Sequence, residues 1–385
     1  MNAPRTVLRI AGDSPRKRGE DRGRQAREGI RCAWGVYEEL FATVAAANGR
    51  DPDPAHVSRL ALRTVEATRA WAPDLVEEME GVAEGAGVPF TTIAALNART
   101  EILAEAGAPR AGECSTLVDT AAGPALGGQC WDWHEELADA WHPQTVGGDL
   151  RAFAGITEHG ILAKIGVNDA GVGVLFNILG HTDDAATGVP VHLVARQVLG
   201  TAGSFAEAVG ILTGAPVSAS TVITVVTADR AASVELAPGG SAVVAPDERG
   251  RLVRTNHFLD PALAAGELRG RREPETYDRH RLLTARVGAR SAAAGPFDPE
   301  ALAGLLAAHQ EDGAEVCCHA PADGRLGSRW ATLATVAVDP AARSLAVHDG
   351  GPCSATPSTW TRLTPPSTRA RLTPPSTRTR LAPPS

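Results

Sequence analysis

Lysine, aromatic side chains and long apolar runs are scarce in this chain. Of its 385 residues only Lys17 and Lys164 are lysines, and aromatic residues make up 4%. No stretch approaches the roughly 18 apolar residues that a membrane span needs. Residues 1–13 carry Arg5 and Arg9 and lack the apolar block of a secretory signal. These absences argue against a membrane protein, and we expect a cytoplasmic location.

Cysteine is too sparse to form a disulfide framework. Irregularly spaced cysteines in a chain of this length, held in a reducing compartment, are expected to be free thiols. Cys317, Cys318 and His319 are adjacent, but they lack the two-to-four-residue spacing of structural zinc sites. We therefore predict no metal and no bound cofactor. The cysteines are Cys32, Cys114, Cys130, Cys317, Cys318 and Cys353.

The charge balance argues against nucleic acid as the main partner. The formal net charge is -8, and residues 356–385 contribute five arginines and no acid, so the other 355 residues sum to about -13 by subtraction. Such an excess of acids repels a phosphate backbone. With 43% hydrophobic and 21% charged residues, the composition is that of an ordinary globular protein with a buried core.

Apolar periodicity divides the chain into helical and strand-rich parts. In the first third, apolar residues recur every three or four positions, as one buried helix face requires. From Cys114 onward, short β-branched runs alternate with glycine-rich turns, and two more helices precede the last strands. This order predicts an α+β fold with sheets covered by helices in layers. The predicted helices are Asp21–Asn48, Asp74–Glu84, Thr91–Ala104, Pro274–Val287 and Pro299–Ala308, and the predicted strands are Cys114–Val118, Leu126–Trp133, Ile161–Val167, Val172–Ile178, Thr221–Thr227, Ser233–Leu236, Arg251–Asn256, Ala331–Val338 and Ser344–His348.

The C-terminal residues have a composition of their own. From Arg362 to Ser385 the sequence is a near-repeat of nine residues, RLTPPSTRA, RLTPPSTRT and RLAPPS. Paired prolines and the scarcity of large apolar side chains prevent core formation. Residues 356–385 are therefore predicted to be a disordered extension.

The segment from Gly112 to Trp133, GECSTLVDTAAGPALGGQCWDW, is the most informative for chemistry. It is typical of two strands joined by a turn near Gly123. If the hairpin is symmetric about that glycine, residues whose numbers sum to 246 lie opposite each other, and Cys114 then opposes Asp132. This assumed register predicts a thiol and a carboxylate side by side, whereas a slip of one residue would place them on opposite faces.

A cysteine thiol needs a proton acceptor before it attacks an amide at neutral pH, because its usual pKa is roughly 8.5. His134 and His142 are near in sequence, but no pattern directs either toward Cys114. The other solution is to make Cys114 the first residue of a chain, so that its own α-amine, with a pKa of roughly 8, takes the proton. That solution requires cleavage between Glu113 and Cys114, and the Asp132 carboxylate would orient the resulting ammonium.

Seven motifs in order resemble the autoproteolytic cysteine acyltransferases and amide hydrolases related to acyl-coenzyme A:6-aminopenicillanic acid acyltransferase. The resemblance implies a four-layer αββα N-terminal-nucleophile hydrolase sandwich. It also implies a precursor that cuts itself into a helical α chain, residues 1–113, and a catalytic β chain from 114 to about 355, which remain associated. The motifs are GEDRGRQAREGI (Gly19–Ile30), PDLVEEMEGVAEGAGV (Pro73–Val88), LNARTEIL (Leu96–Leu103), ECSTLV, GGQCWDW, KIGVNDAGVGVLFNIL (Lys164–Leu179) and RTNHF (Arg254–Phe258).

The same resemblance assigns roles to individual residues. Cys114 matches the nucleophile, Asp132 the carboxylate of the WDW segment, and Asn256 in RTNHF the asparagine of the oxyanion hole. Backbone amides near Asn177 would supply a second donor to the oxyanion. The late arginine of the family is placed at Arg329. Glu113 departs from the glycine that precedes the nucleophile in the best-known member of the family.

These features predict an enzyme that passes an acyl group from an amide or thioester, through a thioester on Cys114, to water or to an amine. A small acyl amide is the expected substrate, and an acyl-coenzyme A is compatible as a co-substrate. Hydrolysis and transfer differ only in the last step, so both stay open. Two alternatives also remain: an unprocessed, non-catalytic binding protein on the same fold, and an uncut cysteine hydrolase with a histidine base.

Overall fold

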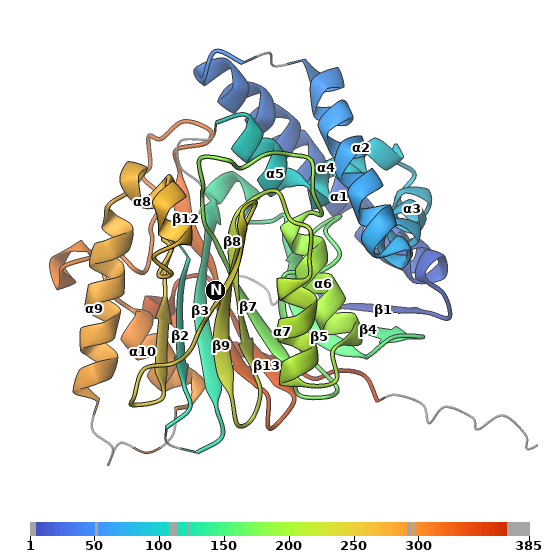
Figure 1. Ribbon diagram of the computed structural model, residues 1–385. Coiled ribbons are helices and arrows are strands. Elements are labelled where there is room, and N and C mark those ends of the chain that lie inside the picture. Colours follow the sequence, from blue (N-terminus) through green and yellow to red (C-terminus); the bar gives the residue numbers. More distant parts are fainter. Residues whose placement is uncertain are drawn as a thin grey trace, which may run out of the picture.

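Two β-sheets lie face to face at the centre of the molecule (Figure 1). The computed structural model describes residues 5–50, 53–107, 114–121, 123–290, 295 and 297–367. The larger sheet has the strand order β1-β4-β5-β6-β7-β8-β9-β10, and the smaller has the order β11-β2-β3-β12-β13-β14. The first sheet comprises β1 (Leu8–Gly12), β4 (Trp141–Gly148), β5 (Phe153–Glu158), β6 (Ile165–Asn168), β7 (Gly173–Ile178), β8 (Thr221–Val226), β9 (Ala231–Ala237) and β10 (Gly240–Val244). The second comprises β2 (Ser115–Asp119), β3 (Leu126–His134), β11 (Arg251–Arg254), β12 (Trp330–Asp339), β13 (Ser344–Asp349) and β14 (Trp360–Leu363).

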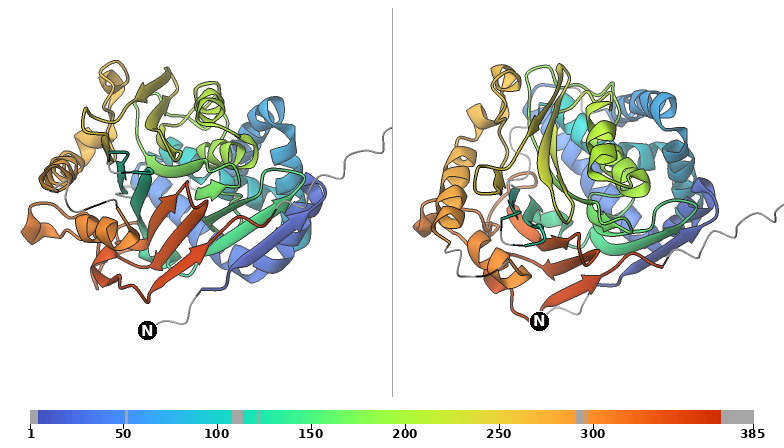
Figure 2. Two further views of the ribbon diagram at one scale, coloured as in Figure 1. Left: turned by 90° about the horizontal axis from the view of Figure 1, so that it is seen from below. Right: turned by 60° about the horizontal axis from the view of Figure 1, so that its bottom comes forward.

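Helices cover the outer face of each sheet, so the sandwich has four layers. Helices α6 (Val191–Thr201) and α7 (Phe205–Thr213) pack on β6, β7, β8 and β9 of the larger sheet. On the other side, α9 (Glu275–Ala289) and α10 (Pro299–Leu306) pack on β2, β3, β11 and β12, as Figure 2 shows from two further directions. Every residue of β3 and β7 is buried, as strands covered on both faces require. The predicted αββα architecture is confirmed.

The N-terminal third forms a helical group beside one end of the sandwich, shown in blue and cyan in Figure 1. Two of its helices, α1 and α3, come into close contact through glycines: a Cβ added at Gly19 would lie 2.0 Å from the carbonyl oxygen of Glu78, and one added at Gly81 would lie 2.1 Å from that of Arg16. Only glycine permits this approach. The group consists of α1 (Pro15–Ala47), α2 (Pro54–Trp71), α3 (Pro73–Ala86), α4 (Phe90–Asn97) and α5 (Arg99–Glu105).

The N-terminal segment is nevertheless not purely helical. Strand β1 pairs in parallel with β4, from Leu8 opposite Gln144 to Gly12 opposite Gly148. One buried apolar cluster includes residues of α1, such as Ile30, together with residues of the sandwich, such as Phe153. The helical segment and the sandwich therefore share a continuous core. No helix in the described ranges is long and apolar enough to cross a membrane.

The predicted helices and strands all have counterparts, but several elements were missed. No predicted helix or strand corresponds to α2, α6, α7, α8 (Arg269–Arg272), β1, β4, β5, β10 or β14. Prediction of disorder from residue 356 is wrong for the start of that segment, because Trp360–Leu363 pairs with β13 and Leu363 is buried. An exposed strand edge offers unpaired backbone groups that can order even a proline-rich chain. Residues 368–385 lie outside the described part.

Candidate active site

Cys114 lies immediately before β2, at the end of a strand that faces the larger sheet. Its side chain is 4% exposed and belongs to the same apolar cluster as Trp131 and Trp133. The thiol donates a long contact, 3.9 Å, to the backbone oxygen of Asp132. Glu113, on the other side of the predicted cleavage point, lies outside the described residues. The thiol is thus fixed between the two sheets.

The register of the β2–β3 hairpin differs by one residue from the prediction. Ser115 pairs with Cys130 and Asp119 with Leu126, so opposed numbers sum to 245 and not to 246. The Asp119 carboxylate accepts the N–H of Ala121 at 2.7 Å, and this local turn reverses the chain earlier than a turn symmetric about Gly123. The prediction that Cys114 directly opposes Asp132 is therefore wrong.

Because side chains alternate along a strand, the shift decides where Asp132 points. Asp132 shares a face with Cys130, which packs in the apolar cluster under α9 and α10, whereas Cys114 faces the space between the sheets. The Asp132 carboxylate accepts the Cys318 thiol at 3.6 Å. Burial is the largest cause that raises the pKa of the Cys114 thiol, and the negative charge of the nearby Asp132 carboxylate is the next largest. Cys114 and Asp132 are neighbours through the backbone, and their side chains diverge.

The carbonyl oxygen of Cys114 is held by two side chains. Asn177, on β7 of the facing sheet, donates its amide N–H to this oxygen at 2.9 Å. Its own amide oxygen accepts the Thr116 hydroxyl at 2.7 Å, which fixes the orientation of the amide. Arg279, on α9, donates to the same carbonyl at 3.2 Å. The backbone at the candidate nucleophile is therefore held by the facing sheet on one side and by helix α9 on the other.

Arg279 also links Asn256 to this group. The guanidinium donates to the Ser115 hydroxyl at 3.0 Å and to the amide oxygen of Asn256 at 3.1 Å. With its oxygen held there, the Asn256 amide turns its N–H toward the backbone oxygen of Ile178, at 2.8 Å. The structure thus brings Cys114, Asn177 and Asn256 together, with Arg279 between them.

Arg329, the arginine chosen from the sequence, lies elsewhere. Its guanidinium is paired with Glu135 and lies 3.9 Å from Glu136, and it donates to the backbone oxygen of Pro321 at 3.3 Å. Arg279 was missed, although one signal was available: it sits with Thr276, Leu283 and Val287 on the buried face of a helix that was predicted. A charged side chain on an otherwise apolar helix face is expensive to bury without a partner, so it marks a candidate contact.

A buried charged cluster lies near the thiol. Glu158 accepts two bonds from Arg99, at 2.6 and 2.7 Å, one from Lys164 at 3.0 Å and one from the Tyr37 hydroxyl at 2.6 Å. The Lys164 ammonium also lies 4.1 Å from the ring centroid of Trp131. Burial lowers the pKa of Lys164 to about 8, and its positive charge favours the Cys114 thiolate.

The thiol itself is not activated in this state. Burial is the main cause that raises the pKa of Cys114 above its usual value. Among the described residues, no imidazole is in hydrogen-bond contact with it: His134 packs against the Trp330 ring, with centroids 4.0 Å apart, and His142 stacks on His159. Burial also lowers the pKa of His134 to about 3. Neither histidine is placed to act as the base.

A cavity of about 280 Å³ borders the group. Trp133, next to Asp132 on β3, and Ile178, next to Asn177 on β7, form part of its wall. Apolar side chains such as Leu103 and Leu179 share the lining with charged ones. The charged or titratable members are Arg50, Glu105, His181, Asp184, Arg269, Arg272 and Glu273. A small substrate with both an apolar part and a polar part fits such a lining.

Comparison with known proteins identifies relatives of this chain. A family model described as acyl-coenzyme A:6-aminopenicillanic acid acyl-transferase matches residues 123–351, more than half of the chain. A curated protein of Emericella nidulans, the 40 kDa form of an acyl-coenzyme A:6-aminopenicillanic-acid-acyltransferase, is 31% identical over 286 residues, which are 73% of this chain and 76% of that protein.

Solved structures show lower likeness. The Caenorhabditis elegans orthologue of N-acylethanolamine-hydrolyzing acid amidase is 16% identical, with a TM-score of 0.43, and the match covers 59% of this chain and 93% of that one. Penicillin V acylase of Agrobacterium tumefaciens is 13% identical, with a TM-score of 0.36, over 61% of this chain and 83% of that one.

Proposed function

Since this chain belongs to the acyl-coenzyme A:6-aminopenicillanic acid acyl-transferase family, we propose that Cys114 is the nucleophile of an acyl-transfer reaction and acts only after self-cleavage before it. The observation that carries the proposal is the combination of an ordered carbonyl and an unactivated thiol. Asn177 and Arg279 hold the Cys114 backbone, yet burial disfavours its thiolate and no imidazole contacts it within the described residues. A free α-amine on Cys114 would supply the missing base.

Self-cleavage follows from the same thiol. Its sulfur attacks the carbonyl carbon of Glu113, and the bond from that carbon to the Cys114 nitrogen breaks as the nitrogen takes a proton. A thioester now joins Glu113 to the sulfur, and the α-amine is free. Water then hydrolyses the thioester, which releases a Glu113 carboxylate and restores the thiol. Lys164, whose charge favours the thiolate, supports the first attack.

Turnover uses the freed amine. It accepts the thiol proton, the thiolate attacks the carbonyl carbon of the substrate, and the proton passes to the leaving amine as the acyl group moves to sulfur. Water or an acceptor amine then takes the acyl group. The Asn256 amide is the proposed donor to the tetrahedral oxygen, a role worth roughly 3 to 4 kcal/mol of barrier. Arg279 positions Asn256 through the contact to its amide oxygen.

The cavity beside the site indicates the class of substrate. Its volume of about 280 Å³ suits a small acyl amide, and the mixed lining suits an apolar acyl part joined to a polar or charged amine part. We favour hydrolysis as the last step because water needs no pocket of its own. An acyl-coenzyme A donor is the alternative for the transfer reaction.

Intact mass and N-terminal sequencing of the purified chain test the proposal. We expect two fragments, residues 1–113 and 114–385, with Cys114 as the second starting residue. They should co-elute in gel filtration, because the described helices of the first fragment share a core with the sandwich. The processed protein should hydrolyse members of a panel of acyl amides.

Cys114→Ala should stay uncut and inactive, whereas Cys32→Ser, a change at an exposed cysteine of α1, should behave like the unmodified protein. A fully active preparation that contains only the uncut chain would refute the proposal. An uncut and inactive chain would instead support a non-catalytic binding protein.

A further inference from the structure

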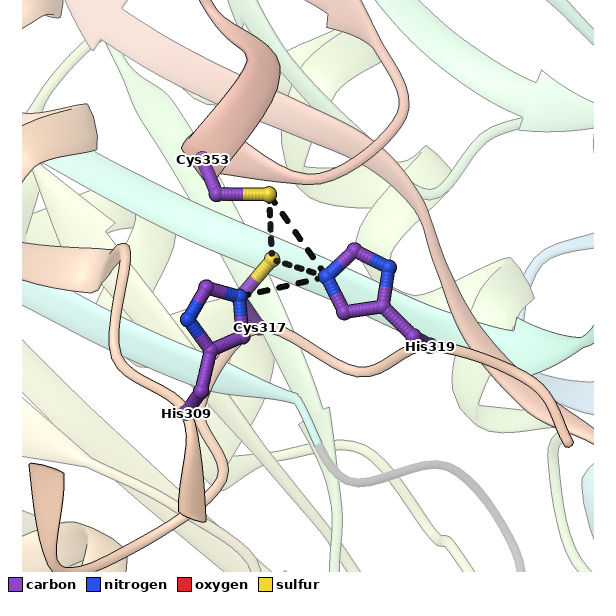
Figure 3. Close-up of side chains that lie close together, drawn as sticks. All are labelled: His309, Cys317, His319 and Cys353. Carbon is purple, nitrogen blue, oxygen red and sulfur yellow. Dashed lines mark hydrogen bonds between the residues drawn. The ribbon is translucent and has the colours of Figure 1, made fainter. Parts of the chain in front are cut away.

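Four side chains from three segments of the chain converge about one point, near the start of β12 and the end of β13 in the smaller sheet (Figure 3). His309 follows α10, Cys317 and His319 lie in the loop before β12, and Cys353 lies in a short 3₁₀ helix after β13. Each offers one ligand atom, and the four atoms all lie within 4.8 Å of one another. Both histidines present the Nε2 atom to the centre. The cluster is separate from the proposed reaction, because within the described residues these four side chains contact one another and none forms a hydrogen bond with Cys114.

Four of the six separations between the ligand atoms are close to those between ligands of a tetrahedral ion. Zinc bonds of about 2.3 Å to sulfur and about 2.05 Å to nitrogen place sulfur pairs about 3.8 Å apart, sulfur–nitrogen pairs about 3.6 Å and nitrogen pairs about 3.4 Å. Here the two sulfurs are 3.5 Å apart, and the His319 Nε2 atom lies 3.6 Å from Cys317 Sγ and 3.5 Å from Cys353 Sγ. The two Nε2 atoms are 3.1 Å apart. These four separations lie within a few tenths of an ångström of the tetrahedral values, and all six are at most 4.8 Å.

The backbone around the four residues allows their side chains to lie this close together. Gly351 lies beside the cluster, and a Cβ there would be 2.6 Å from Cys317 Sγ, so a larger residue would push the sulfur away. The backbone N–H of Cys317 donates to the Ala308 oxygen at 2.9 Å, which joins the two ligand-bearing segments. The outer ring nitrogen of His309 lies 4.0 Å from a Glu311 carboxylate oxygen. An acid on the outer side of a ligating histidine is a common feature of zinc sites.

We propose that His309, Cys317, His319 and Cys353 bind one structural Zn²⁺ ion. Two thiolates and two imidazoles form a ligand set that zinc prefers, and four protein ligands fill its coordination sphere, as in structural sites. Binding releases the two thiol protons to solvent and leaves two thiolates that neutralise the ion, without any change of oxidation state. The spacing in the sequence does not indicate the site, because its ligands come from three segments.

The ion would anchor the loop that carries Cys318. This cysteine lies between two of the ligands, its thiol contacts the Asp132 carboxylate at 3.6 Å, and its N–H donates to the Thr332 hydroxyl at 2.9 Å. Zinc would thus hold the loop before β12 against the end of β13 and keep Cys318 beside Asp132. Its role is to stabilise the fold next to the candidate active site.

The test is the metal content of the full chain, expressed without a histidine tag and dialysed against metal-free buffer. Mass spectrometry of the elements should find about one zinc per chain. Cys353→Ser, at an exposed position, should lower this content at least about tenfold while circular dichroism stays unchanged. Cys32→Ser is the matched control, because Cys32 is an exposed cysteine outside the cluster, and it should keep the zinc.

A second measurement does not depend on a variant. After chelation and addition of Co²⁺, the unmodified chain should show the thiolate-to-cobalt absorption of a tetrahedral site, and chelation should lower its melting temperature. Zinc below about one-tenth per chain together with no cobalt spectrum would overturn the proposal. So would a Cys317–Cys353 disulfide found by peptide mapping of freshly purified protein. Cys114→Ala should retain zinc, so failure of the proposed function and failure of this site are separable.

Discussion

At the scale of single residues, one guanidinium links three parts of the candidate site. Arg279 is 1% exposed and donates to the Cys114 carbonyl, the Ser115 hydroxyl and the Asn256 amide. A bond to a buried charged group contributes more than a neutral one, and losing the donor leaves its acceptors unsatisfied. Arg279 therefore serves as a positioning residue for the proposed nucleophile, Cys114, and for the proposed oxyanion donor, Asn256.

We expect Arg279→Met to lower kcat of the processed enzyme about 100-fold or more, because Asn256 loses the contact that orients it. KM should change less, since Arg279 is not in the wall of the cavity. Steady-state kinetics on an acyl amide that the enzyme accepts, together with intact mass to verify processing, measure both effects. Arg329→Met is the comparison and should change kcat only a few-fold. Equal losses in the two variants would contradict the role given to Arg279.

At the scale of elements, a buried acid joins two helices. The Glu101 carboxylate of α5 accepts the N–H of Val191 at 2.9 Å, and Val191 is the first residue of α6. It thus satisfies a backbone donor at a helix start that has no side-chain cap of its own. Burial raises the pKa of Glu101 from 4.5 to about 7. The stability that this contact between α5 and α6 contributes therefore depends on pH.

The sign of this dependence follows from proton binding. Between about pH 4.5 and pH 7 the folded chain keeps the Glu101 proton and the unfolded chain loses it, so this group makes stability fall as pH rises through that window. Glu101→Gln keeps an acceptor oxygen without the charge. We expect the variant to be more stable than the unmodified protein by about 1 to 3 kcal/mol at pH 8 and nearly equal to it at pH 4.5. Urea unfolding at the two pH values measures the difference, and an equal shift at both would contradict the assignment.

At the scale of the whole molecule, the core of the described residues extends across the predicted cleavage point and includes Leu363 of β14. The Arg99–Glu158 pair and the Tyr37–Glu158 bond join helices before Cys114 to β5 of the sandwich. At the other end, β14 covers the edge of β13, and Pro366 packs on Gly147 of β4. The helices before Cys114 and the segment that follows β13 therefore both pack on the sandwich.

A pair of truncations tests where the folded part ends. A chain of residues 1–355 loses β14 and the buried Leu363, and we expect its unfolding free energy to fall by about 2 to 3 kcal/mol. A chain of residues 1–367 keeps these contacts and should match the full protein within about 0.5 kcal/mol. Thermal and denaturant unfolding compare the three chains. If the shorter truncation were as stable as the full protein, β14 would have no stabilising role.

Much of this protein was determined locally by its sequence. Period-3.6 and period-2 patterns predicted the elements of α1, α3, α9, β3, β7 and β12, because each pattern reflects one buried face or an alternation that neighbouring residues set together. The ordered motifs around Cys114 and Asn256 indicated the family, and the structure does bring Asn177 and Asn256 close to Cys114. Elements such as α6 and β4 were missed because their burial depends on surfaces supplied by distant segments.

Tertiary structure alone decided the finer geometry. The pairing of β2 with β3 has a register one residue away from the assumed one, which turns the Asp132 side chain away from the Cys114 thiol. Long-range packing selected Arg279 over Arg329 and brought His309 and Cys353 to the loop of Cys317 and His319. These outcomes depend on which distant side chains meet in three dimensions. A local pattern in the sequence predicts whether a residue is buried or exposed, but it does not predict which distant residue it will contact.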